Sequence, residues 1–292
     1  MKLTHLGGPT VLIETEGWRI LTDPTFDPAG GRYGFGWGTG STKTTGPAIS
    51  ATEVGEIDAV LLSHDQHADN LDDSAREWLG QASRIITTTT AARRLPHPLA
   101  TGLRPGQATL LEAPDRPVVR ILATPCRHGP PLSRPITGPV VGFALTVGST
   151  ERTSLWVTGD TVLTGAVRDT ARALRPDVLV MHLGGVRFPI TGPLRYTMNA
   201  DDAVELVHLA QPRVAVPVHA EGWTHFAEPL ADLRRTLDHA PDDVRELVRW
   251  LRPGEPATVW AAQRSRTPDR SEGSFASSMT TRRGCPDVPV TR

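Results

Sequence analysis

Eight short runs of apolar and β-branched residues recur along the chain, and most of them stop at Gly, Pro, Asp or His. They occupy residues 9–15, 18–23, 58–63, 118–124, 141–147, 154–160, 177–183 and 213–219. Runs of this length and composition are typical of β-strands. Helical periodicity appears at residues 72–79, 166–174, 201–210, 229–237 and 241–251, and Asn199 is a plausible N-cap for the third helix. The pattern predicts an α/β protein with two strand-rich halves.

Composition narrows the class of protein further. The 292 residues are 38% hydrophobic and carry a formal net charge of −1, which suits a large packed core. No run reaches the roughly 20 apolar residues of a membrane span, and no leader pattern is visible, so we expect a cytoplasmic protein. Because no block of Lys or Arg stands out, we expect a small-molecule substrate and no nucleic-acid partner. The oligomeric state is not indicated.

Two segments have few large apolar residues. Residues 264–292 are so polar that we predict a disordered tail after a domain that spans residues 1–263. Residues 29–46 are rich in Gly, Ser and Thr, which predicts a surface loop. The loop either covers a pocket with its aromatic side chains or has no ligand role.

A cluster of potential metal ligands follows the third apolar run. In "SHDQHADN" the side chains of His64, Asp65, His67 and Asp69 fall within six residues. Imidazole nitrogens and carboxylate oxygens suit Zn, Mn or Fe. The alternative is a polar loop whose histidines cap backbone groups.

Three further candidate ligands stand just past apolar strands. His128 follows "ILATPCR", Asp160 follows "SLWVTG", and His219 follows "RVAVPV". Because the ends of neighbouring strands converge at the rim of a sheet, these side chains are expected to meet the cluster at residues 64–69. The sequence therefore predicts a metal site.

The order "HDQHAD", "TPCRHG", "VTGDT" and "VPVHAEGW" resembles the metallo-β-lactamase superfamily. The opening "MKLTHLGGPTVLIETEGWRILTDPTFD" and the stretch "TMNADDAVEL" are similar to the branch that contains the L-ascorbate-6-phosphate lactonases and the N-acylphosphatidylethanolamine phospholipases D. The resemblance covers roughly residues 1–251. It implies a four-layer αββα sandwich with metals in a cleft at one edge of the two sheets.

The resemblance also implies a set of ligands. The first metal would be held by His64, His67 and His128, the second by Asp69 and His219, and Asp160 would bridge the two. The cofactor would be Zn, one ion or two, with Mn or Fe as alternatives.

The cluster departs from the family pattern HxHxDH at two places. Two residues rather than one separate the histidines, so either a bulge lets His64 and His67 both bind, or Asp65 takes the first place and His64 supports it. Asn70 stands where the family has a histidine, and a neutral amide is a poor replacement for imidazole. The second metal is therefore expected to be weakly held or absent.

The function expected from this site is hydrolysis. A metal-bound hydroxide would cleave a small ester, lactone or phosphodiester, with Asp69 or Asp160 as the catalytic carboxylate that orients it and moves its proton. The alternative is a degenerate, single-metal or non-catalytic member that serves as a binding module.

Several other side chains are candidates to line the pocket. His182 and Glu221 are the main ones, and Tyr196, Trp223 and His225 are further possibilities. Asp23 in "LTDPTFD" is expected to support the loops near the metals.

Overall fold

The strands form two large sheets and one hairpin. The computed structural model describes residues 1–150 and 152–259. One sheet has seven strands in the order β15-β1-β2-β3-β6-β7-β8, the other has six in the order β14-β13-β12-β11-β10-β9, and β4 pairs with β5. The strands are β1 (Lys2–Gly7), β2 (Thr10–Thr15), β3 (Trp18–Thr22), β4 (Arg32–Gly36), β5 (Thr39–Thr42), β6 (Ala59–Leu61), β7 (Ile85–Thr88), β8 (Ala100–Leu103), β9 (Ala108–Leu111), β10 (Val119–Pro125), β11 (Val141–Val147), β12 (Leu155–Val157), β13 (Val178–His182), β14 (Val214–Val218) and β15 (Ala257–Thr258).

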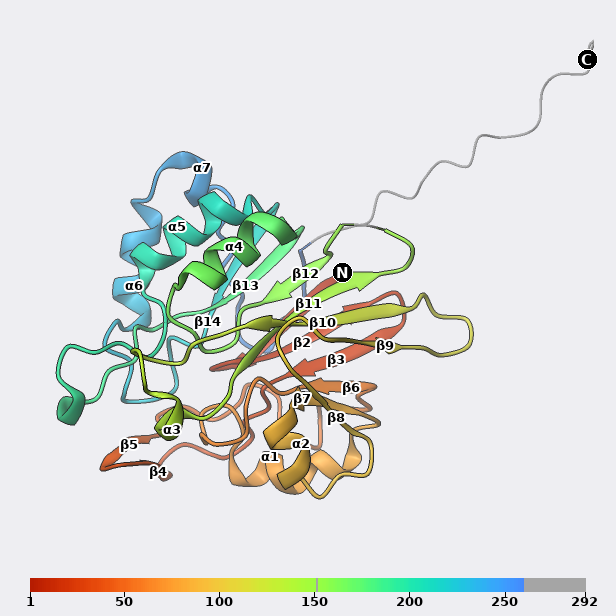
Figure 1. Cartoon of the computed structure of the whole chain (residues 1–292), viewed down its shortest axis with the longest axis horizontal. Coiled ribbons are helices and arrows are strands. Elements are labelled where there is room, and N and C mark those ends of the chain that lie inside the picture. Colours follow the sequence, from red (N-terminus) through yellow and green to blue (C-terminus); the bar gives the residue numbers. More distant parts are fainter. Residues whose placement is uncertain (151, 260–292) are drawn as a thin grey trace, which may run out of the picture. The chain divides into compact units, whose positions relative to one another are not determined.

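Helices cover the outer face of each sheet, as Figure 1 shows. The helices α1 (Asp73–Trp78) and α2 (Thr89–Arg94) lie beside the seven-stranded sheet, and α4 (Gly165–Leu174), α5 (Ala200–Ala210), α6 (Leu230–Asp238) and α7 (Asp242–Arg245) lie beside the six-stranded one. Two 3-10 turns, η1 (Leu79–Gln81) and η2 (Pro189–Thr191), and the short α3 (Arg134–Thr137) complete the fold.

Alternation along the strands builds three separate apolar layers. In β11, Phe143 and Leu145 belong to the cluster between the two sheets, whereas Ala144 belongs to the cluster under α4 and α5. In β3, Ile20 faces the central cluster and Leu21 faces a third cluster together with α1. Because successive strand residues point to opposite faces, each buried strand serves two layers. The predicted αββα sandwich is confirmed.

Most of the expected elements are present. All eight predicted runs contain strands, and Asn199 caps α5, where its side chain accepts from the Asp202 backbone N–H in a capping box. The helix predicted at residues 241–251 is wrong beyond Arg245. The chain there becomes extended because it pairs with the edge of β14, where Ala215 donates to the Leu247 carbonyl and accepts from the Arg249 N–H. Strands β1, β4, β5, β7, β8, β9 and β15 were not predicted.

The segment at residues 29–46 is a hairpin rather than an irregular loop. Strands β4 and β5 pair antiparallel, with Gly36 opposite Thr39. The two residues between them, Trp37 and Gly38, have φ values of 54° and 75°. Two successive positive φ values make the turn whose twist matches that of a hairpin, which is why a glycine-rich segment pairs here.

The predicted boundary between residues 263 and 264, and the tail after it, lie outside the described residues. Within the described ranges, every helix is too short or too polar to cross a membrane.

Candidate metal centre

Four strand ends bring the candidate ligands together. In the six-stranded sheet, β12, β13 and β14 are parallel to one another, and β11 runs antiparallel to both β10 and β12. The C-terminal ends of β10, β12 and β14 therefore lie at one edge of the sheet, and they are followed by His128, Asp160 and His219. The loop after β6 adds the cluster at residues 64–69 from the facing sheet.

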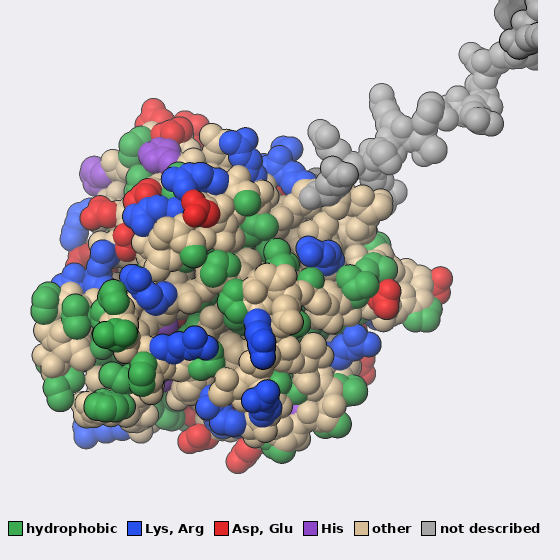
Figure 2. All heavy atoms as spheres, in the orientation of Figure 1, with side chains coloured by type: hydrophobic (Ala, Val, Ile, Leu, Met, Phe, Trp, Pro, Cys, Tyr) green, Lys and Arg blue, Asp and Glu red, His purple; other side chains and the backbone are tan. Residues whose placement is uncertain are grey.

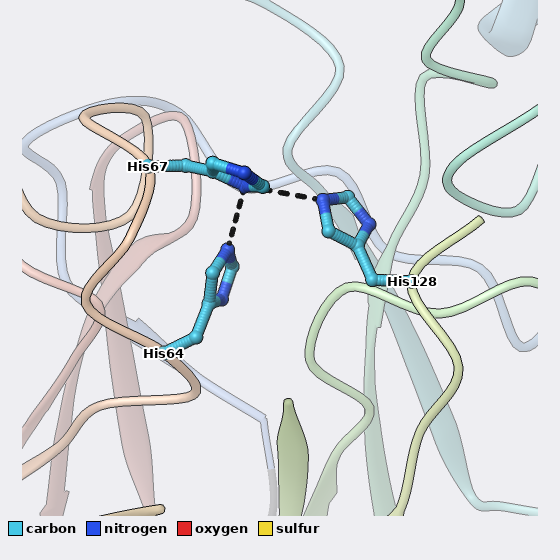
Figure 3. Close-up of side chains that lie close together, drawn as sticks. All are labelled: His64, His67 and His128. Atoms are coloured by element: carbon cyan, nitrogen blue, oxygen red, sulfur yellow. Dashed lines mark hydrogen bonds between the residues drawn. The ribbon is translucent and has the colours of Figure 1, made fainter. Parts of the chain in front are cut away.

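Three imidazoles form the first group of ligand atoms. The Nδ1 atom of His67 lies 3.0 Å from Nε2 of His64 and 3.2 Å from Nε2 of His128. Figure 3 shows the three rings pointing toward one another, His64 and His67 from one loop and His128 from a separate segment of the chain. All three side chains are buried.

A contact on the far side of one ring fixes its tautomer. Nδ1 of His128 lies 2.9 Å from the carbonyl of Tyr196, which can only accept, so this nitrogen carries the proton and Nε2 keeps a lone pair. Nδ1 of His64 lies 2.9 Å from Oγ of Ser63, a hydroxyl that can donate or accept. Nδ1 of His67 carries either one proton or one lone pair, so it can satisfy only one of its two close imidazole neighbours. A cation at their centre would satisfy all three nitrogens, and nitrogens on one tetrahedral Zn²⁺ lie roughly 3.3 Å apart.

A second group contains one carboxylate and two imidazoles. Oδ2 of Asp69 lies 3.3 Å from Nε2 of His219 and 3.1 Å from Nε2 of His225. The other nitrogen of His225 lies 2.6 Å from Oγ of Ser41 on β5, so the hairpin orients this ring. All ligand atoms within each group lie within 4.8 Å of one another.

Asp160 lies between the two groups. Its Oδ1 atom is 3.3 Å from Nδ1 of His219, and its Oδ2 atom is 4.0 Å from Nε2 of His128. The side chain is fully buried, and its close polar neighbours are His219 and the amide of Asn70, whose contact lowers its pKa against the effect of burial. Neither contact meets full hydrogen-bond geometry. A buried carboxylate with so few donors is costly unless a cation lies beside it, so this geometry fits a bridging ligand.

Burial keeps the histidines neutral, which is the form that binds metals. It lowers the pKa of His64 well below 6.5 and lowers the pKa values of His67 and His219. It lowers the pKa of His128 to about 3.

The two carboxylates shift in opposite directions. Burial would raise the pKa of Asp69, but its hydrogen bonds to His219 and His225 outweigh that effect and hold its pKa well below the usual value. Burial raises the pKa of Asp160, and the nearby charges of Asp69 and Asp23 raise it further. A divalent cation between them would favour the charged form of both.

The two registers considered for the cluster at residues 64–69 differ in the place of Asp65. In the structure Asp65 forms an ion pair with Arg94, whose Nε lies 2.9 Å from its Oδ2. His64, not Asp65, faces His67 and His128. The geometry therefore favours the register with a bulge.

Asn70 does not join either group of facing ligand atoms. Its place in the second group is taken by His225, which we expected only to line the pocket. The available signal was the spacing in "HAEGWTHF", which puts a second histidine six residues after His219. When one loop lacks an expected ligand, a histidine in a loop after a neighbouring strand can take its place.

A small cavity of about 20 Å³ adjoins both groups. Its lining includes Phe35 of the hairpin, whose ring centroid lies 5.2 Å from that of His67 and 5.5 Å from that of His225. The rest of the lining consists of Thr39, His67, Asp69, His128, Ile136, Thr137, Val186, Phe188, Tyr196 and His225.

Three of the predicted lining residues lie elsewhere: His182, Glu221 and Trp223, the last of which lines the same separate cavity as Glu221. Nε2 of His182 is 3.4 Å from Oδ2 of Asp23, in the buried layer behind His219. Asp23 in turn accepts from the backbone N–H of Ser63, so this pair supports the loop that carries His64. Glu221 faces a separate cavity of about 160 Å³, with Oε1 3.4 Å from Nε2 of His5.

This fold and this pair of ligand groups define a metallohydrolase of the αββα class. The family described as the β-lactamase superfamily domain matches residues 18–220, which is well over half of the chain. The chain belongs to that superfamily and is a metal-dependent hydrolase. The narrower resemblance to the lactonase and phospholipase D branch stays a prediction.

Relatives and solved structures agree with this assignment. A metal-dependent hydrolase from Carboxydothermus hydrogenoformans is 28% identical over 272 residues, which cover 87% of this chain and 98% of that protein. An isothiocyanate hydrolase from Delia radicum gut bacteria has a TM-score of 0.73 and 21% identity, and covers 89% of this chain and 100% of that one. A possible metal-dependent hydrolase from Veillonella parvula has a TM-score of 0.73 at 20% identity, covering 88% and 99%. The two structural likenesses show the fold alone.

Proposed function

We propose that the two ligand groups hold two divalent ions, zinc in the first instance, and that the enzyme hydrolyses a small ester, lactone or phosphodiester. His64, His67 and His128 hold the first ion, Asp69, His219 and His225 hold the second, and Asp160 serves both. The observation that carries the proposal is the convergence of buried, neutral imidazoles whose nitrogens face one another.

A divalent ion at this centre polarises the bond under attack and lowers the pKa of a bound water toward 7. The chain supplies the proton acceptor. Oδ1 of Asp69 is buried without a hydrogen-bond partner among the described residues, while Oδ2 is held by His219 and His225. Asp69 is thus positioned to take a proton from the attacking water, and Asp160 to orient it.

Substrate entry requires movement of the hairpin β4–β5. A cavity of about 20 Å³ holds roughly one water molecule and no ester. Phe35 forms one wall and Phe188 packs against it, with ring centroids 6.0 Å apart. Displacement of the hairpin opens the centre, and its return excludes bulk water.

The test is elemental analysis of protein purified without added metal, combined with assays on generic esters, lactones and bis-p-nitrophenyl phosphate. We expect bound metal, with metal content and turnover both lost in His67→Ala and Asp160→Ala. A folded protein without metal or turnover would instead support the binding-module alternative. Unchanged metal content in both variants would show that the ligand assignment is wrong.

A further inference from the structure

A second, larger cavity lies beside the metal centre. It has a volume of about 190 Å³ and shares two lining residues, His128 and Thr137, with the small cavity at the ligands. The segment that follows β10 and leads through α3 therefore forms a wall common to both cavities. A molecule that occupies the larger cavity lies one side chain away from the first group of ligands.

Three arginines line this larger cavity, which we call the arginine cavity. They are Arg104 after β8, Arg127 directly before His128, and Arg134 at the start of α3. All three arginines are exposed, and Nε of Arg127 donates to the Gly129 carbonyl. None of the three forms an ion pair within the part of the chain that the structure describes, and no Asp or Glu is among the lining residues. Figure 2 shows Lys and Arg side chains across the face that carries α2 and α3, with few acidic side chains between them.

Apart from His128, the other polar side chains of the lining carry hydroxyl or thiol groups. Some of them already donate to backbone carbonyls, and the others could donate to an anion. Ser133 donates to the His128 carbonyl, and Thr137 donates to the Ser133 carbonyl. The buried carboxylates of Asp160 and Asp23 lie near the lining residue Cys126, and the charge of Asp65 is paired with Arg94. The lining itself carries a positive charge in a chain whose formal net charge is −1.

We propose that the arginine cavity binds an anionic group of the substrate, a carboxylate or a phosphate, while the scissile bond lies at the metal centre. This rests on the proposed function and narrows it to substrates with a negatively charged group outside the bond that is cleaved. Guanidinium groups bind such oxyanions by charge-assisted, often bidentate hydrogen bonds, and unpaired arginines pay no cost of breaking an existing ion pair.

The kinetic experiment compares two esters of similar length on the metal-loaded, full-length enzyme: mono-p-nitrophenyl succinate, which is anionic, and p-nitrophenyl butyrate, which is neutral. The cavity variant is Arg104→Gln/Arg127→Gln/Arg134→Gln. Its ratio of kcat/KM for the anionic over the neutral ester is expected to fall roughly tenfold, mainly through KM. The control, Arg235→Gln/Arg245→Gln/Arg252→Gln, removes the same charge from exposed arginines paired within their own segments and should leave the ratio unchanged.

A binding arm uses inorganic phosphate and calorimetry, and it does not depend on turnover. We expect the wild type and the control to bind phosphate, and the cavity variant to bind it at least tenfold more weakly. Equal affinity in all three proteins, loss in both variants, or no binding by the wild type would each overturn the proposal. If neither ester is cleaved by metal-loaded wild type, the proposed function fails for these esters, and the phosphate arm still decides the arginine cavity.

Discussion

The ligand rings of this centre are held on both sides. His128 and His225 each present Nε2 to the other ligands while Nδ1 contacts Tyr196 or Ser41. Such outer contacts fix the orientation of both rings, and the Tyr196 carbonyl also fixes the tautomer of His128. Burial lowers the pKa of His128 to about 3, which favours its neutral form.

His225→Ala should remove one ion per chain and leave the other, because the second group then retains only Asp69 and His219 beside Asp160. Metal content measured by elemental analysis checks this, with His208→Ala as a control at a partly exposed histidine of α5. Equal metal content in His225→Ala and the wild type would mean that His225 is not a ligand.

His64→Ala and Asp65→Asn separate the two registers of the cluster. We expect His64→Ala to lose metal from the first group. Asp65→Asn should keep its metal but lower the free energy of unfolding by about 1–3 kcal/mol, since it removes the buried negative charge and one of the two acceptor oxygens that face Arg94. Metal analysis and urea unfolding of both variants provide the test. The opposite pattern, metal lost only in Asp65→Asn, would restore the register in which Asp65 binds.

At the scale of elements, a buried ion pair is one of the contacts that hold the hairpin β4–β5 against the rest of the molecule. Nζ of Lys43, the residue after β5, lies 2.8 Å from Oδ2 of Asp72, and both side chains are buried. Asp72 also accepts from the backbone N–H groups of Phe26, Asp27 and Ala75, so it joins the hairpin to the start of α1. The same hairpin carries Phe35 and Ser41, which contact the metal ligands.

Lys43→Met should therefore lower the free energy of unfolding by about 3 kcal/mol, because it leaves the buried Asp72 carboxylate without its counter-charge. The matched control is Arg172→Met, which breaks the exposed pair with Asp169 and should cost less than about 1 kcal/mol. Urea unfolding of the two variants gives the comparison. Equal effects would show that the Lys43 pair does not anchor the hairpin.

Sequence patterns predicted several strands whose side chains alternate between two apolar layers, such as β11 and β13, but not the shorter β7, whose Ile85 and Ile86 also face two layers. They did not predict β8 or β9, whose burial patterns are mixed, with Thr and Gly positions that lack an apolar period. The hairpin was missed because its pairing depends on turn conformation and on contacts with distant residues, including Thr224. The roles of His225 and Arg94 were missed for the same reason: both depend on loops that meet only after folding.

At the scale of the whole molecule, the centre lies where the two sheets face each other. The loop after β6 belongs to one sheet, and the segments after β10, β12 and β14 belong to the other. Under the proposed ligand assignment, metal bound across this junction would stabilise the folded chain, because the ligands come together only in the fold. Without metal, the same junction contains several buried imidazoles and two buried carboxylates.

The stability of the metal-free protein should consequently fall as the pH is lowered from 7 to 5. Burial lowers the pKa values of His64, His67, His128 and His219 from 6.5, so below that pH the unfolded chain binds protons that the folded chain excludes. Each histidine that stays neutral in the fold then lowers the free energy of unfolding by up to about 1.4 kcal/mol for each unit that the pH falls. Asp160 acts in the opposite sense, because its raised pKa means that the folded chain holds that proton more tightly, but it is one group against four. Urea unfolding in the presence of chelator at pH 7, 6 and 5 measures the slope, and His128→Gln should reduce it by the share of one histidine. A free energy of unfolding that is constant from pH 7 to 5 would contradict the neutral, buried state of these rings.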